Sequence, residues 1–238
     1  MLETNRSKRS KPRKESGIHG KHYERKTLAV IALKCLLHED INDFWILSNP
    51  EDVEKFDDII LSTEHANGQK KVFFIQVKHK LPGKERPLVA HKLDREDKDL
   101  GLKVYEKAFL ETDFKDFFER HDIQHKSKII LVLFTNHNVD QKIPNDNIGF
   151  ECGSNSQFSF INTTLTPDTI LKIKNKTGKY NQHFIDKFYF YTEQLSEDSI
   201  NKEICRLLEF NDATTQILVS FVSSWVDPNK DYCIKLKK

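Results

Sequence analysis

The chain has 238 residues, of which 37% are hydrophobic and 31% are charged, and its formal net charge is +2. This length and composition are typical of a globular domain with one sizeable core, and they exclude a largely disordered chain. The longest apolar runs fall short of the roughly 20 residues that cross a bilayer, and the basic start lacks the apolar segment of a signal peptide, so we expect no membrane partner.

The cysteines indicate a reducing compartment. They lie far apart and form no C-x-x-C pair, so we expect buried free thiols and no zinc site. The four positions are Cys35, Cys152, Cys205 and Cys233. This pattern favours a cytoplasmic or nuclear protein.

The first 17 residues are basic. Six Lys or Arg residues fall between positions 6 and 14, with Pro12 and no apolar anchor. We expect residues 1–17 to be a disordered arm that serves nuclear import, contacts phosphates or only raises solubility. The side chains in this arm that would contact nucleic acid are Arg9, Lys11, Arg13 and Lys14.

Helical spacing of apolar residues predicts a first helix over residues 20–38. Its expected buried stripe contains Leu28, Val30, Ile31, Cys35 and Leu37. Glu24 precedes Leu28 by four positions and Ile31 by seven, which places this acid on the apolar face. A glutamate that favours the helix dipole is the alternative, but that role does not explain its inward direction.

A hairpin follows the first helix. Strands are expected at residues 44–49 and 56–61, and Asn67-Gly68 is a strong hairpin signal that leads into a further strand at 72–80. We expect residues 81–99 to form a charged linker.

The rest of the chain also contains predicted helices and strands in alternation. We expect a helix or helix pair at 99–121, a strand buried on both faces at 128–136, weak strands such as 158–161 in a polar stretch, and a strand at 186–194. Helices near 196–210 and 212–225 would follow. The helix-pair residues expected to point inward are Leu100, Val104, Ala108 and Phe109. The element order predicts one α/β domain around a mixed sheet over residues 18–238.

The strand at residues 73–80, FFIQVKHK, carries polar groups where packing alone would not place them. Phe73, Ile75 and Val77 share one face, so Gln76 and Lys78 follow Phe74 along the other. A half-buried strand normally keeps its inward face apolar. These two polar residues therefore call for a functional explanation.

The hairpin register predicts which acid meets this strand. If Asn67-Gly68 are the two central turn residues, Asp57 lies opposite Lys78 and Ile59 lies opposite Gln76. A one-residue bulge would bring in Asp58 instead. We favour Asp57 and keep Asp58 as the alternative.

Oxygen donors gathered in this way are suited to Mg²⁺ or Mn²⁺. The expected metal-site groups are Asp57 or Asp58, the Gln76 amide, the Val77 carbonyl and Glu24. Lys78 would orient the attacking water or neutralise charge that develops on a phosphate. The alternative is an exposed ion pair between Asp57 and Lys78, worth under about 1 kcal/mol.

The segments FDDIIL and FFIQVKHK resemble the D…(E/Q)xK signature of the PD-(D/E)xK, or restriction-endonuclease-like, nuclease superfamily. The Q-V-K variant is similar to its Mrr-like branch and to double-stranded-DNA nuclease effector domains at the N-termini of NACHT-type defence proteins. The resemblance is sharpest over residues 17–80 and looser at the strands 128–136 and 186–194.

This resemblance implies a three-layer core, with the catalytic part at about 18–136 and a final strand and helices at about 184–226. It implies a Mg²⁺-dependent endonuclease acting on double-stranded DNA with low sequence specificity, compatible with a homodimer and with a sensor NTPase as partner. The catalytic residues that it indicates are Glu24, Asp57 (or Asp58), Gln76 and Lys78. His79 and Lys80 would touch phosphate or simply end the strand. Gln76 stands where most of the superfamily has an acid, which leaves open a catalytically silent nucleic-acid-binding module.

Overall fold

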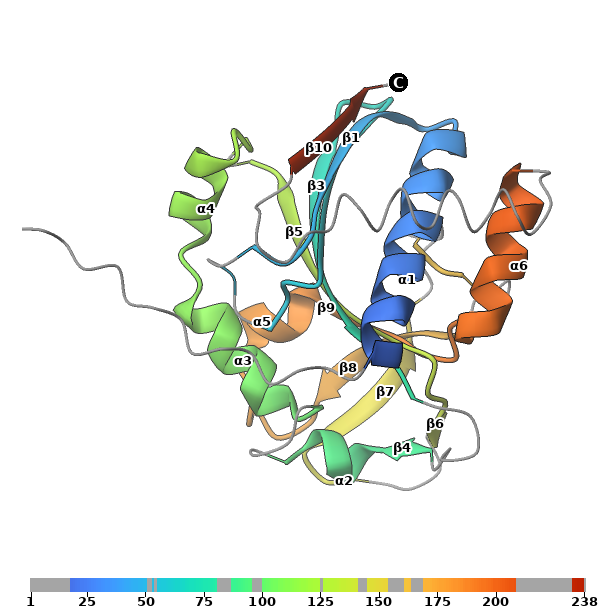
Figure 1. The fold of residues 1–238 in the computed structure, drawn as a ribbon. Coiled ribbons are helices and arrows are strands. Elements are labelled where there is room, and N and C mark those ends of the chain that lie inside the picture. Colours follow the sequence, from blue (N-terminus) through green and yellow to red (C-terminus); the bar gives the residue numbers. More distant parts are fainter. Residues whose placement is uncertain are drawn as a thin grey trace, which may run out of the picture.

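A computed structural model describes residues 18–50, 53, 55–80, 87–95, 100–124, 126–140, 145–153, 161–163, 169–208 and 233–237. The chain is an α/β fold around one mixed eight-stranded sheet (Figure 1). In spatial order, its strands are β10 (Cys233–Lys237), β1 (Ile41–Leu47), β2 (Ile59–His65), β3 (Lys70–Lys78), β5 (Lys128–Thr135), β9 (Phe188–Tyr191), β8 (Ile170–Asn175) and β7 (Ile148–Cys152). A separate pair joins β4 (Leu88–Val89) to β6 (Val139–Asp140).

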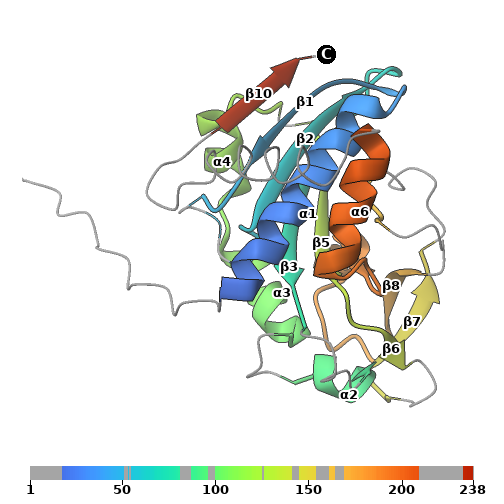
Figure 2. The same ribbon diagram turned by 45° about the vertical axis from the view of Figure 1, so that its right-hand side comes forward.

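Helices cover both faces of the sheet. One face carries α1 (Ile18–Leu37) and α6 (Glu197–Leu208), which lie side by side (Figure 2). The other face carries α3 (Leu102–Glu111), α4 (Phe114–Arg120) and α5 (Gln182–Lys187), with the short α2 (Ala90–Leu93) near the lower edge (Figure 1). Within the described residues, no helix has the length and apolar character needed to cross a membrane.

The alternation of β3 separates two cores. Phe73, Ile75 and Val77 pack in the cluster on the α1 side, whereas Val72 and Phe74 pack in the cluster that includes α3 and α4. The two faces predicted for this strand are therefore confirmed. Gln76 and Lys78 continue the face that Phe74 begins.

The centre of the sheet is parallel. β5 pairs in parallel with β3 on one side and with β9 on the other. Residues 130–134 of β5 are all fully buried, because helices cover both faces there. The prediction of a strand buried on both sides is confirmed, and so is the helix pair, as α3 and α4.

Several expectations need correction. β2 begins at Ile59, three residues later than predicted. Leu37 is 55% exposed because α1 ends there, and Val104 is only half-buried because Leu102 and Tyr105 take the inward positions of α3. Cys152 is exposed, although it is a free thiol as expected.

Some predicted segments fall outside the described residues, and other elements were not expected. The arm 1–17 and the helix 212–225 lie outside, as do residues 158–160. The short α2, the strand β8, the helix α5 and the strand β10 were not predicted.

Candidate functional site

Three strand ends meet at one corner of the sheet. β1 ends at Leu47, β2 begins at Ile59 and β3 ends at Lys78, and antiparallel pairing places these ends together. We call the set Ser48, Asn49, Asp57, Asp58, Gln76, Val77 and Lys78 the strand-end corner. The first turns of α1 lie over it, because Glu24 on that helix hydrogen bonds to Asn49.

The turn between β2 and β3 decides which aspartate faces β3. The His65 N–H donates to the Gln69 carbonyl (2.9 Å) and the Gly68 N–H donates to the His65 carbonyl (2.8 Å), so three residues, 66–68, form the turn. Gly68 adopts φ 77°, which costs least at glycine. Ile59 therefore pairs with Ile75. The predicted register, with Ile59 opposite Gln76 and Asp57 opposite Lys78, is wrong by one residue.

Asp58 is the acid that contacts the Q-V-K segment. Its Oδ2 accepts hydrogen bonds from the Gln76 side-chain amide and from the Val77 backbone N–H, the second at 2.7 Å. Gln76 is only 5% exposed, so its amide would carry a desolvation penalty without such a partner. The hydrogen bond to Asp58 accounts for a glutamine at a buried position of this strand.

Glu24 joins the corner through two residues that sequence reasoning missed. The Asn49 side-chain amide donates to Glu24 Oε1 (2.7 Å) and to Ser48 Oγ (2.8 Å), and the Ser48 hydroxyl donates to the Asp58 carbonyl (3.0 Å). Asn49 adopts φ 52°, a left-handed conformation that asparagine tolerates better than most residues. The signal for this link was a polar pair directly after an apolar strand and before Pro50.

Asp57 and Lys78 lie at the corner but do not form the exposed cross-strand pair considered above. Asp57 is 7% exposed, and its carbonyl accepts from the Asn49 N–H at 2.7 Å. Lys78 is half-buried and pairs with Thr135 in the parallel ladder at the last position of β3. The structure therefore places Lys78 beyond Gln76, at the end of the same face.

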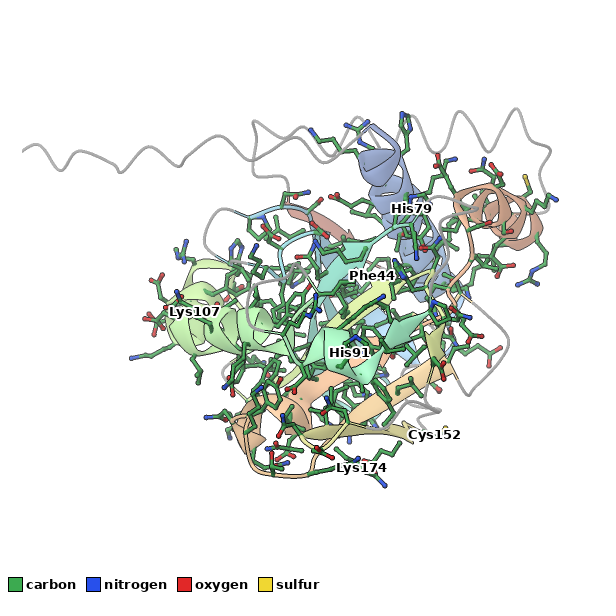
Figure 3. The ribbon with its side chains drawn as sticks, turned by 90° about the horizontal axis from the view of Figure 1, so that it is seen from below. Phe44, His79, His91, Lys107, Cys152 and Lys174 are labelled. Atoms are coloured by element: carbon green, nitrogen blue, oxygen red, sulfur yellow. The ribbon has the colours of Figure 1, made fainter. Side chains whose placement is uncertain are left out.

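His79 and Lys80 continue past the strand. The His79 ring stacks on Tyr23 of α1 with ring centroids 4.4 Å apart, and Figure 3 shows His79 beside that helix. The Asn136 side chain bonds to both the N–H and the carbonyl of Lys80, each at 2.8 Å. The arm residues Arg9, Lys11, Arg13 and Lys14 lie outside the described residues.

The oxygen atoms at the strand-end corner are of the kind that a hard cation prefers as ligands. Within the described ranges, no three His, Cys, Asp or Glu side chains lie close enough to form a metal site. Mg²⁺, however, keeps several waters and needs only one or two protein carboxylates. Asp58 and Glu24 supply carboxylates, and Gln76 supplies an amide oxygen, because its nitrogen is the atom that faces Asp58.

Comparisons with known proteins do not assign this chain. No protein-family model matches the sequence, and no curated protein matches it.

Proposed function

We propose that this chain is a metal-dependent endonuclease with a restriction-endonuclease-like core. The observation that carries the proposal is the contact of the Asp58 carboxylate with the Gln76 amide and the Val77 N–H. It joins in space the two halves of a D…QxK motif that are 18 residues apart in sequence. The order of one helix and three antiparallel strands at the start of the fold supports the same assignment.

Four residues of the strand-end corner, together with Glu24 of α1, have roles in this proposal. Asp58 would hold Mg²⁺ or Mn²⁺, and the other donors would be the Gln76 amide oxygen, the Val77 carbonyl and Glu24. When bound, such an ion polarises a phosphodiester and acidifies a water molecule. Gln76 orients Asp58 through its hydrogen bond. Lys78 would orient the attacking water or neutralise the charge that develops on the phosphate.

Double-stranded DNA is the proposed substrate, on the strength of the sequence resemblance. Low sequence specificity is expected because binding would depend on lysines that contact phosphates and carry no base readout. A homodimer would suit cleavage of both strands, and a role as a defence effector beside a sensor NTPase would follow the same resemblance.

Nicking of a supercoiled plasmid tests this proposal. We expect nicking in Mg²⁺ or Mn²⁺, none in EDTA, and none for Lys78→Ala or Asp58→Asn. Lys107→Ala is the matched control, because Lys107 is 74% exposed on α3 and pairs only weakly with Glu111 at 3.7 Å. Nicking that persists in EDTA, or that survives in Lys78→Ala, would contradict the assignment.

A catalytically silent nucleic-acid-binding module is the second candidate. It is favoured by Gln76, whose amide donates a hydrogen bond to Asp58 and contributes no negative charge. This candidate predicts DNA binding that is unchanged by Lys78→Ala, with no cleavage in either metal.

A further inference from the structure

His137 is a half-buried histidine that the proposed chemistry leaves without a role. It lies two residues after β5, and its backbone is fixed on both sides. Its N–H donates to Thr135 Oγ1 (3.2 Å), and its carbonyl accepts from the Glu193 N–H (2.7 Å). Its Nδ1 atom is buried and has no hydrogen-bond partner within the part of the chain that the structure describes. Buried polar atoms of this kind are rare, and each needs an explanation.

Lys80 is held close to His137 by the end of the parallel ladder. The last paired residues of β3 and β5 are Lys78 and Thr135. Beyond them, the Asn136 side chain continues the pairing, because it hydrogen bonds to both the N–H and the carbonyl of Lys80. This bridge fixes the backbone of Lys80 beside the residue that precedes His137.

The helix α2, which carries Lys92, lies at the same edge. The Leu88 N–H donates to the Asn138 carbonyl (3.0 Å), and the β4–β6 pairing then joins Leu88 to Val139. This pairing brings the start of α2 next to the residues that follow β5. Figure 3 looks onto this edge from below, with His91 of α2 labelled near the middle of the view, His79 beside α1 and Lys107 far to one side.

The electrostatics of His137 agree with this gathering of positive groups. Burial, together with repulsion from Lys80, His79 and Lys92, lowers the pKa of His137 to about 4. The ring is therefore neutral at pH 7. An anion bound at this edge would reduce the repulsion and would raise the pKa of His137 again.

From this geometry we infer that Lys80, Lys92 and His137 form a phosphate subsite at the carboxyl ends of β3 and β5. The subsite holds a backbone phosphate of the nucleic acid next to the phosphate at Lys78, so it rests on the proposed function. Open α/β sheets bind ligands at the carboxyl ends of their strands, and lysine contacts to phosphates supply most of the affinity for nucleic acid.

Binding of a fluorescent DNA duplex in EDTA, where metal-dependent cleavage cannot occur, tests the subsite. We expect Lys92→Ala to weaken binding about fivefold and to lower the slope of log K against log salt by about 0.9, the value for one lost phosphate contact. Lys107→Ala is the control and keeps both values. In the unmodified chain, proton NMR should show the pKa of His137 rising when the duplex binds.

The results of these measurements test the phosphate subsite separately from the nuclease assignment. If Lys92→Ala and Lys80→Ala both keep the slope of the control, the subsite is overturned even when the chain cuts DNA. The same holds if the pKa of His137 does not move on binding. If the slope falls and the pKa rises while no metal supports cleavage, the subsite stands and the nuclease assignment fails.

Discussion

Asp58 and Asp94 are both enclosed by hydrogen-bond donors, but the donors differ in charge. The donors identified at Asp58 are a neutral amide and a backbone N–H. Asp94, at the end of α2, accepts from Tyr180 (2.6 Å) and Asn147 (2.7 Å) and forms an ion pair with Lys179 (3.0 Å). Burial raises the pKa of Asp94, but these bonds outweigh it and lower the pKa.

This difference separates a structural acid from a candidate functional one. Lys179 neutralises Asp94 within the fold, so the cluster ties α2 to the segments around β7 and β8. The two hydrogen bonds that Asp58 accepts from Gln76 and Val77 come from neutral groups and orient its carboxylate. An oriented acid at a strand end is suited to hold a cation, whereas a neutralised one contributes mainly to stability.

Asp58→Asn should give the largest effect on activity. The amide removes the negative charge, so we expect DNA nicking to fall more than about 100-fold. Asp94→Asn should keep nicking per folded molecule close to that of the unmodified chain. Comparable losses in the two variants, in a nicking assay normalised to folded protein, would remove the distinction between the two acids.

Asp94→Ala should give the largest effect on stability. It removes the carboxylate that Lys179 and Tyr180 contact, in a site where the Asp94 side chain is 11% exposed, so we expect a loss of about 2–3 kcal/mol in urea unfolding. Asp116→Ala is the control, because its ion pair with Arg120 is exposed and should be worth under about 1 kcal/mol. Equal losses would contradict the reading of Asp94 as a structural centre.

Gln76→Glu should make stability depend on metal. It places a second carboxylate against Asp58, so the melting temperature should fall by about 3 °C in EDTA, equivalent to about 1 kcal/mol. Mg²⁺ or Mn²⁺ should restore more stability in this variant than in the unmodified chain. A thermal-shift titration that gives the same metal response in both would argue against a cation at the corner.

His137→Gln should have the smallest effect near neutral pH, and its effect should be visible only in acid. The folded pKa of His137 is about 4, below the ordinary value of 6.5, so the unfolded chain binds a proton between these values while the folded chain does not. Stability from this neutral ring is present above pH 6.5 and is lost as pH falls toward 4. The variant should therefore melt higher than the unmodified chain near pH 5 but not near pH 7.5. His22→Gln, at an exposed position of α1, should show no such difference.

The sequence predicted the faces of β3 correctly because alternation depends only on local geometry. Phe73, Ile75 and Val77 point to one core in any register of the hairpin. The register itself depends on the turn. Asn67-Gly68 marked the hairpin, but the turn has three residues, and the extra one moved the pairing from Asp57 to Asp58. That choice is set by the conformation of Gly68, which the residue types alone do not fix.

The links around Glu24 could not be predicted in detail. Its half-buried position on α1 followed from helical spacing, whereas its partner Asn49 depends on the path of a loop. β8 was missed because its sequence, ILKIKN, mixes lysines with apolar residues and lies between two short elements. β10 was missed because its pairing with β1 joins opposite ends of the chain.

The parallel pairing of β3, β5 and β9 has a consequence for how the chain can be divided. A protein cut after residue 136 would leave β5 without β9, and the apolar strand would become an open edge prone to association with other molecules. The proposed catalytic part is thus not an independent folding unit. During synthesis, β5 cannot pair with β9 until Tyr191 has emerged from the ribosome. The strands made earlier therefore stay partly folded until then.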